Sequence, residues 1–232
     1  MEWRKCYVDL ILVPLGIMIY MGYHIWLWHK VRTHPLSTVL GRNALGRRFW
    51  VAAIIKDNEK KNILAVQTFR NMIMGSTLMA TTSVLLCTAL AAVISSSYSV
   101  KKPLNDAVYG AHGEFTVALK YVSTLVVFLF SFVCHSLSIR FTNQVNFLIN
   151  CPPPENSSGG VTAAYVAELL ERGFELNTVG CRLFYGGVPL LTWIFGPVLV
   201  FVCYVVVVFV FCNLDFVFVV GEVKGNWDVM NV

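Results

Sequence analysis

Residues 71–100 read NMIMGSTLMATTSVLLCTALAAVISSSYSV and contain no charged side chain. Residues 10–29 and 121–139 carry no ionisable acid, lysine or arginine, only histidine, and residues 183–214 are again free of charge. A helix needs about 20 predominantly apolar residues to cross the hydrocarbon core of a bilayer. Four such stretches in a chain of 232 residues therefore predict an all-α integral membrane protein.

The composition agrees with this class. Hydrophobic residues make up 56% of the chain, charged residues only 13%, and the mean hydropathy is +0.65. No polar connection is long enough for a separate soluble domain, so residues 1–232 are expected to form one membrane domain. We predict four transmembrane helices, with short cytoplasmic or interfacial helices in two connections: spans at about 6–28, 72–97, 115–139 and 188–214, and connections at 29–71 and 140–187.

Motifs for catalysis or for metal and cofactor binding are not evident in the sequence. The seven cysteines include no CxxC pair, and the five histidines show no metal-ligand spacing. No nucleophile with a neighbouring base and no carboxylate pair stands out either. We therefore expect no enzyme activity, no cofactor, no metal and no nucleic-acid partner.

Basic residues are concentrated between the first two spans, and the positive-inside rule places such segments in the cytoplasm. The connections 29–71 and 140–187 are therefore predicted to be cytoplasmic, and both termini non-cytoplasmic. The expected location is the plasma membrane or an endomembrane. Arg4 and Lys5 oppose this orientation but are outnumbered. The sequon at Asn156 is then expected to be cytoplasmic and unmodified. Residues 6–28 are interpreted as a retained span, because no small-residue cleavage site follows them.

The predicted third span carries a polar stripe at helical spacing, so that its members share one face. Small and hydroxyl residues commonly mediate contacts between membrane helices, whereas a charge within the same stripe favours a pathway for ions. Both interpretations stay open. The stripe contains Lys120 and, as a candidate polar pathway, Thr116, Thr124, Ser131, His135 and Ser138.

Asp9 and Lys120 lie about one turn inside the first and third predicted spans, and Asp215 ends the fourth. The predicted threading puts all three near the same, non-cytoplasmic depth. An intramembrane charge is costly unless it is paired or hydrated, so Lys120 is predicted to pair with Asp9, Asp215 or both. The pair is either a structural link or a gate at a pore mouth. At the other end, a candidate cytoplasmic basic cluster consists of Arg70, Arg140 and Arg182.

The cytoplasmic connections are expected to contain helices of their own. Residues 43–56 mix basic and aromatic side chains, as suits a helix at the headgroup boundary or one packed on the end of the bundle. Residues 162–172 are predicted to form a short helix that ends at Gly173.

Several strings distributed along the chain are specific enough to compare with known families. They are His34-Pro35-Leu36, Gly41-Arg42-Asn43-Ala44 with Arg47-Arg48, Ala65-Val66-Gln67 with Arg70-Asn71, Gly110-Ala111-His112-Gly113, and Trp193-Ile194-Phe195-Gly196-Pro197. These strings resemble the plant membrane family known as domain of unknown function 599. The resemblance runs through most of the chain, although Cys181 stands where asparagine is expected in the string Gly180-X-Arg182. It implies a membrane location and a plant source but no activity.

Two functions remain under consideration. In the first, the chain is a subunit of a homo-oligomeric ion channel or transporter, and the polar stripe lines a shared or internal pathway. In the second, it is a membrane adaptor that does not transport, and the basic segment 30–61 binds anionic lipid or a protein partner. Under either function, the chain is expected to contact membrane lipid.

Overall fold

The computed structural model describes residues 2–56, 58–99, 114–150 and 162–216, and every described element in them is helical. Apolar side chains and internally satisfied backbone groups explain this content, since only a helix bonds all of its own amides within one crossing segment. Asn156 lies outside the described residues. The elements are α1 Glu2–Thr33, η1 Pro35–Ser37, α2 Val39–Lys56, α3 Asn58–Ser99, α4 Glu114–Ile149, α5 Ala163–Leu191, η2 Thr192–Ile194 and α6 Pro197–Asp215.

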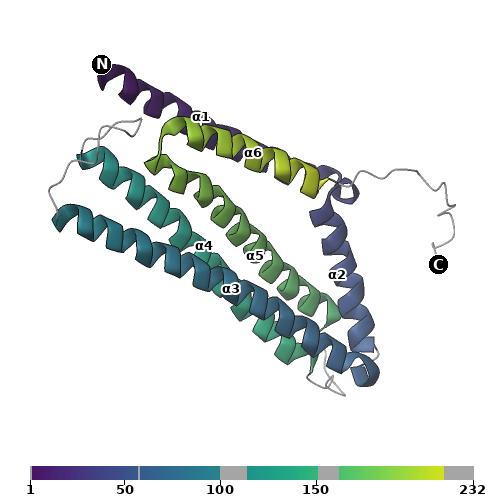
Figure 1. The fold of residues 1–232 in the computed structure, drawn as a ribbon. Coiled ribbons are helices and arrows are strands. Elements are labelled where there is room, and N and C mark those ends of the chain that lie inside the picture. Colours follow the sequence, from purple (N-terminus) through teal and green to yellow (C-terminus); the bar gives the residue numbers. More distant parts are fainter. Residues whose placement is uncertain (1, 57, 100–113, 151–161, 217–232) are drawn as a thin grey trace.

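The long helices α1, α3, α4, α5 and α6 lie side by side, and α2 lies across one end of them (Figure 1). Each long helix runs opposite to the one before it in the sequence, so that the neighbours α1 and α6 run in the same direction. Helix α4 packs between α3 and α5, α5 also contacts α6, and α6 packs along α1. Helix α2 links the end of α1 to the start of α3.

Four helices are long and apolar enough to cross a membrane, and the predicted all-α membrane class is confirmed. Less than a third of the most apolar 18-residue stretch of each helix is buried inside the chain, which leaves surface that can contact lipid. These candidate spans are Val8–Thr33, Ile63–Ser96, Val117–Ile149 and Pro197–Asp215.

Helix α5 differs from the sequence prediction. A short helix over 162–172 was expected, followed by a span over 188–214, but α5 continues without interruption from Ala163 to Leu191. Gly173 does not end a helix, because it lies buried in the contact with α4, where a Cβ would be 3.3 Å from that of Phe141. The apolar run of 188–214 is therefore divided between α5 and α6.

The division occurs at Gly196-Pro197. Helix α5 gives way to the single 3₁₀ turn η2, and Gly196 then adopts φ 147°, a conformation that L side chains rarely adopt. Pro197 occupies the first turn of α6, where its missing amide hydrogen is not needed. The chain thereby reverses direction, and α6 runs antiparallel to α5 (Figure 1).

The reversal brings the end of α6 to the same end of the bundle as the end of α1. Phe216 forms an isolated antiparallel bridge with Thr38, which directly precedes α2. The start of α1 lies at the opposite end of the bundle (Figure 1). The two ends of the described chain are thus separated by the length of the bundle.

Helix α2 is fastened to the bundle by one face. Val51 and Ile54 are buried and pack with Phe69 of α3 and with Val166 and Leu170 of α5. Residues 43–56 were predicted either to lie at the headgroup boundary or to pack on the end of the bundle. The buried face of α2 shows the packing.

Candidate functional site

The first polar site joins Asp9 of α1 to Lys120 of α4. Both side chains are buried, and Lys120 Nζ lies 3.3 Å from Asp9 Oδ2. The indole Nε1 of Trp193, in η2, donates to Asp9 Oδ1 at 3.0 Å, and Lys120 Nζ lies 5.3 Å from the Trp193 ring centroid. Opposite charges, a hydrogen bond and a ring face together stabilise a lysine at this depth. The site ties three separate segments together.

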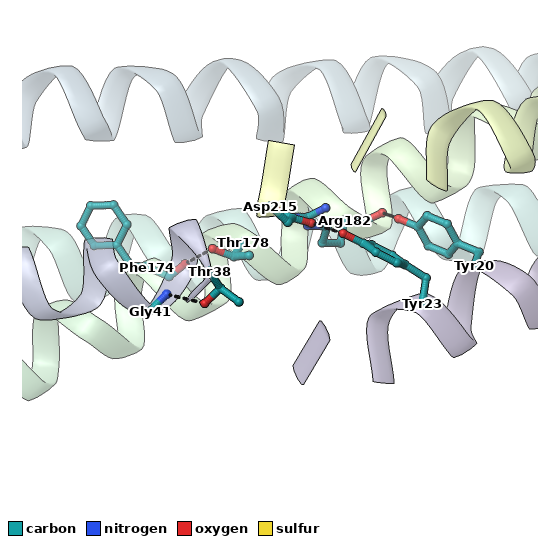
Figure 2. A network of polar contacts seen from close by, with 8 residues as sticks. All are labelled: Tyr20, Tyr23, Thr38, Gly41, Phe174, Thr178, Arg182 and Asp215. Atoms are coloured by element: carbon teal, nitrogen blue, oxygen red, sulfur yellow. Dashed lines mark hydrogen bonds and ion pairs between the residues drawn. The ribbon is translucent and has the colours of Figure 1, made fainter. Parts of the chain in front are cut away.

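The second polar site lies between α1, α5 and α6 (Figure 2). Arg182 of α5 forms an ion pair with Asp215 Oδ1 at the end of α6. The Tyr23 hydroxyl donates to Asp215 Oδ2 at 2.5 Å, and the Tyr20 hydroxyl donates to the backbone carbonyl of Arg182 at 2.5 Å. The guanidinium also lies 4.1 Å above the ring of Phe211. This network ties α1 and α6 to α5.

Asp215 is not at the depth of Lys120, so the prediction that these residues share one depth is wrong. Tyr23, which contacts Asp215, follows Asp9 by fourteen residues in the continuous helix α1. At 1.5 Å per residue, this separates the two sites by about 21 Å along the bundle. The physical reason is the direction of α6, which the uninterrupted α5 reverses.

The polar stripe of α4 faces α5. The hydroxyl of Ser131 donates to the carbonyl of Gly180 at 2.9 Å, and that of Ser138 donates to the carbonyl of Gly173 at 2.7 Å. Thr124 is also buried and donates to the carbonyl of Lys120 in its own helix at 2.7 Å. The side chain of Thr116 lies outside the described residues. Hydroxyl groups of this stripe therefore serve helix packing, as in many membrane bundles.

His135 occupies the middle of this contact. Its Nδ1 lies 3.1 Å from Asn177 Oδ1, and the same oxygen accepts from the Ser76 hydroxyl at 3.1 Å. Ser76 belongs to α3, so a polar link crosses all three helices. The other ring nitrogen, Nε2, is buried and has no hydrogen-bond partner in the described chain. It faces Gly180.

The opposite face of α4 is apolar and exposed. Between residues 122 and 137 its exposed side chains are apolar, so this part can contact lipid or a second protein but offers no polar lining for a channel shared between copies of the chain. The exposed residues include Val122, Val126, Leu129, Phe130 and Val133.

The predicted basic cluster is divided. Arg70 and Arg140 are exposed near the end of the bundle that carries α2, whereas Arg182 is directed to Asp215. Gly180, two residues before Arg182, is level with Ser131, nine residues before Arg140. Arg182 therefore lies deeper than the other two, and the three do not form one cluster.

Helix α2 exposes basic and apolar groups on the face turned away from its buried one. Phe49 is 68% exposed and Leu45 43%, with Arg42 and Arg48 exposed beside them. Arg47 is instead fixed on the bundle by a two-pronged ion pair with Glu171 of α5, at 2.6 and 2.9 Å. The Thr38 hydroxyl accepts from the Gly41 amide at 3.2 Å and caps α2 (Figure 2).

Several of these contacts were missed by sequence reasoning, although one signal for them was present. Gly173, Gly180 and Gly187 are seven residues apart, and so are Thr124, Ser131 and Ser138. Matching seven-residue repeats of small residues on two antiparallel helices indicate a close helix pair. No comparable signal identifies Tyr20, Tyr23 or Trp193.

A family model described as "Protein of unknown function, DUF599" matches residues 11–220. The chain belongs to the DUF599 family. No curated protein and no solved structure matches it.

The DUF599 match includes Lys120, Trp193, Arg182 and Asp215 and begins just after Asp9. It therefore covers both polar sites apart from one carboxylate, as well as α2 and the α5–α6 reversal. The DUF599 description names no activity, so the basis for a function is the chemistry of these surfaces.

Proposed function

We propose that this DUF599 protein is a membrane adaptor whose helix α2 binds anionic lipid headgroups on the cytoplasmic side. One observation carries the proposal: the face of α2 opposite its packed side combines Arg42, Arg48 and Lys56 with the exposed Leu45 and Phe49. A helix with basic residues beside exposed apolar ones is suited to the headgroup boundary. The ion pair of Arg47 with Glu171 fixes the direction in which this face points.

The orientation of the bundle follows from α5. Its last 19 residues, 173–191, run antiparallel to α4 and are long enough to cross a bilayer, despite Arg182 and Glu175. We propose that α5 crosses together with the four apolar helices. The end with α2 carries most of the lysine and arginine, so it is cytoplasmic, and the two chain ends lie on opposite sides.

The expected strength of lipid binding follows from charge. Each lysine or arginine near an anionic bilayer surface contributes about 1 kcal/mol. Loss of Arg42 and Arg48 together should therefore weaken binding by about 2 kcal/mol, roughly a thirtyfold change in Kd.

The test compares two matched double variants of the full-length protein, purified in an uncharged detergent. Arg42→Gln/Arg48→Gln removes charge from α2, and Arg70→Gln/Arg140→Gln removes the same charge from elsewhere on the same end. Binding of short-chain phosphatidylserine and phosphatidylcholine is measured by native mass spectrometry. The proposal predicts a serine-lipid preference that only the α2 variant loses. Equal loss in both variants, or no preference in the unmodified protein, would contradict it.

A protein partner of the segment 30–61 is the main competing occupant of α2. It would be indicated if phosphatidylserine bound weakly while the α2 variant lost a partner recovered from native membranes.

Ion or solute transport is the second candidate function, and one buried and one partly buried ion pair at different depths of one bundle favour it. The polar face of α4 is turned toward α5, so a pathway would have to run within a single chain rather than between copies of a homo-oligomer. Chloride and potassium flux into liposomes tests this function. Flux that changes in Asp9→Asn/Lys120→Met, a pair of substitutions that leaves no unpaired charge, would support it, and no flux from folded protein would exclude a constitutive pore.

A further inference from the structure

A cavity of about 310 Å³ opens between α3, α4 and α5, separate from both ion pairs and from α2. This volume is at the lower end of the range for ligand pockets, about 300–1,000 Å³. Asn71 and Gly75 of α3 are exposed at its edge, so the cavity is accessible from the side of the bundle. It has room for one end of a ligand, whose remainder would extend into the surrounding lipid.

The inner wall of the cavity is polar. Ser76 and Asn177 both line it, and the Ser76 hydroxyl donates to Asn177 Oδ1 at 3.1 Å. His135 Nδ1, behind this wall, holds the same oxygen at 3.1 Å and so fixes the amide in position. In the described chain, the Asn177 side-chain nitrogen makes no hydrogen bond to protein, which leaves a donor beside a hydroxyl. A ligand hydroxyl, which both donates and accepts, complements this pair.

The lining contains no charged side chain. Its remaining walls include Met72, Met79 and Phe174, which are apolar, and the methionines adapt to irregular shapes. An ionised headgroup would lose its hydration here without gaining a counter-ion. An uncharged head with a hydrocarbon body is therefore the favoured ligand.

The depth of the cavity fits the same ligand. Asn71 follows Arg70, and Ser138 precedes Arg140 by two residues, and both arginines are exposed. Arg70 borders the stretch 71–100 and Arg140 borders the stretch 121–139, neither of which contains an acidic residue, lysine or arginine. Exposed arginines at such borders mark the membrane boundary. The polar wall thus lies just inside the headgroup region, at the level reached by the hydroxyl group of a membrane alcohol.

We propose that this cavity binds the hydroxyl end of an uncharged lipid alcohol from the leaflet that borders α2. Two sources share this chemistry, a sterol and a diacylglycerol. The hydroxyl bonds to Asn177 and Ser76, and the hydrocarbon passes the exposed edge at Asn71 and Gly75 into the bilayer. This site is independent of anionic-lipid binding by α2.

The experiment uses the full-length protein in phosphatidylcholine nanodiscs with three photoreactive probes: a sterol, a diacylglycerol and a phosphatidylcholine. Labelled peptides are mapped by mass spectrometry, with unlabelled lipid as competitor. We expect saturable labelling of cavity residues by the sterol or the diacylglycerol, and the comparison of these two arms identifies the source. Equal labelling by the phosphatidylcholine probe, or no labelling of cavity residues by either alcohol, would overturn the proposal.

Two variants with a matched control connect the labelling to the cavity. Gly75→Leu fills the cavity from an exposed position where a Cβ meets nothing within 4 Å, and Gly22→Leu makes the same change on α1, where there is equal space. Gly75→Leu should reduce labelling at least tenfold and Gly22→Leu should leave it unchanged. Ser76→Ala keeps the cavity open but removes one hydrogen-bonding group. It should raise the competitor concentration needed for half-maximal competition about fivefold. Unchanged labelling in both cavity variants would overturn the proposal.

Discussion

Gly180 lies directly against the ring of His135: a Cβ at Gly180 would be 2.9 Å from His135 Nε2. Along the same contact between α4 and α5, the Ser138 hydroxyl donates to the Gly173 carbonyl and the Ser131 hydroxyl donates to the Gly180 carbonyl. The separation of α4 and α5 is therefore set by residues without side chains on α5, and the histidine ring fits only because of them. The centre of the bundle is a close-packed contact between two helices.

Gly180→Ala should destabilise the protein by about 1–3 kcal/mol, because the added methyl group displaces a ring that Asn177 holds in place. Unfolding of the full-length protein in detergent, followed by circular dichroism, measures this change. Gly22→Ala is the control, since its Cβ has open space. Equal stability of the two variants would mean that α4 and α5 are not in close contact at His135.

Asp9 and Lys120 should behave as a coupled pair. Lys120→Met alone leaves a buried carboxylate without its ammonium group and should cost about 3–5 kcal/mol of unfolding free energy. The double variant Asp9→Asn/Lys120→Met should recover most of that loss, because neither charge remains. The same detergent unfolding assay gives all four values of the cycle. Additive losses would show that the two charges do not interact.

Asp215 should couple to Arg182 and not to Lys120. In double-mutant cycles with Asp215→Asn, we expect an interaction energy above about 1 kcal/mol for Arg182→Gln and additivity within about 0.5 kcal/mol for Lys120→Met. The reason is the separation of the two polar sites along α1. A large coupling between Lys120 and Asp215 would instead support the arrangement in which α6 runs in the opposite direction.

The apolar spans could be predicted because lipid contact imposes apolar side chains on most of a helix surface. The predicted ranges 72–97 and 115–139 both lie entirely within longer helices, because the polar extensions of these helices contain no helix-breaking residue. Lys120 was expected to have a carboxylate partner, and Asp9 is that partner. The free-energy cost of an unpaired lysine inside the membrane was sufficient to predict an ion pair for Lys120. It was not sufficient to choose between Asp9 and Asp215 as the partner.

Helix α5 could not be recognised from hydropathy, for a physical reason. It is surrounded by α2, α4 and α6, so it faces protein on several sides and can retain Glu171, Asn177 and Arg182, each paired with another element. A helix enclosed in this way need not be as apolar as one that faces lipid. Because the prediction did not include α5 as a long helix, it gave α6 the opposite direction. Asp215 was therefore expected at the wrong end of the bundle.

The sidedness of the two chain ends tests most directly whether α5 crosses the bilayer with the four apolar helices. Epitope tags on the two ends of the full-length chain are compared by protease protection in sealed cell-derived vesicles, before and after permeabilisation. Five crossings predict an N-terminal tag on the non-cytoplasmic side and a C-terminal tag in the cytoplasm. Two tags on the same side would contradict a crossing by α5, and an N-terminal tag in the cytoplasm would contradict the cytoplasmic position proposed for α2.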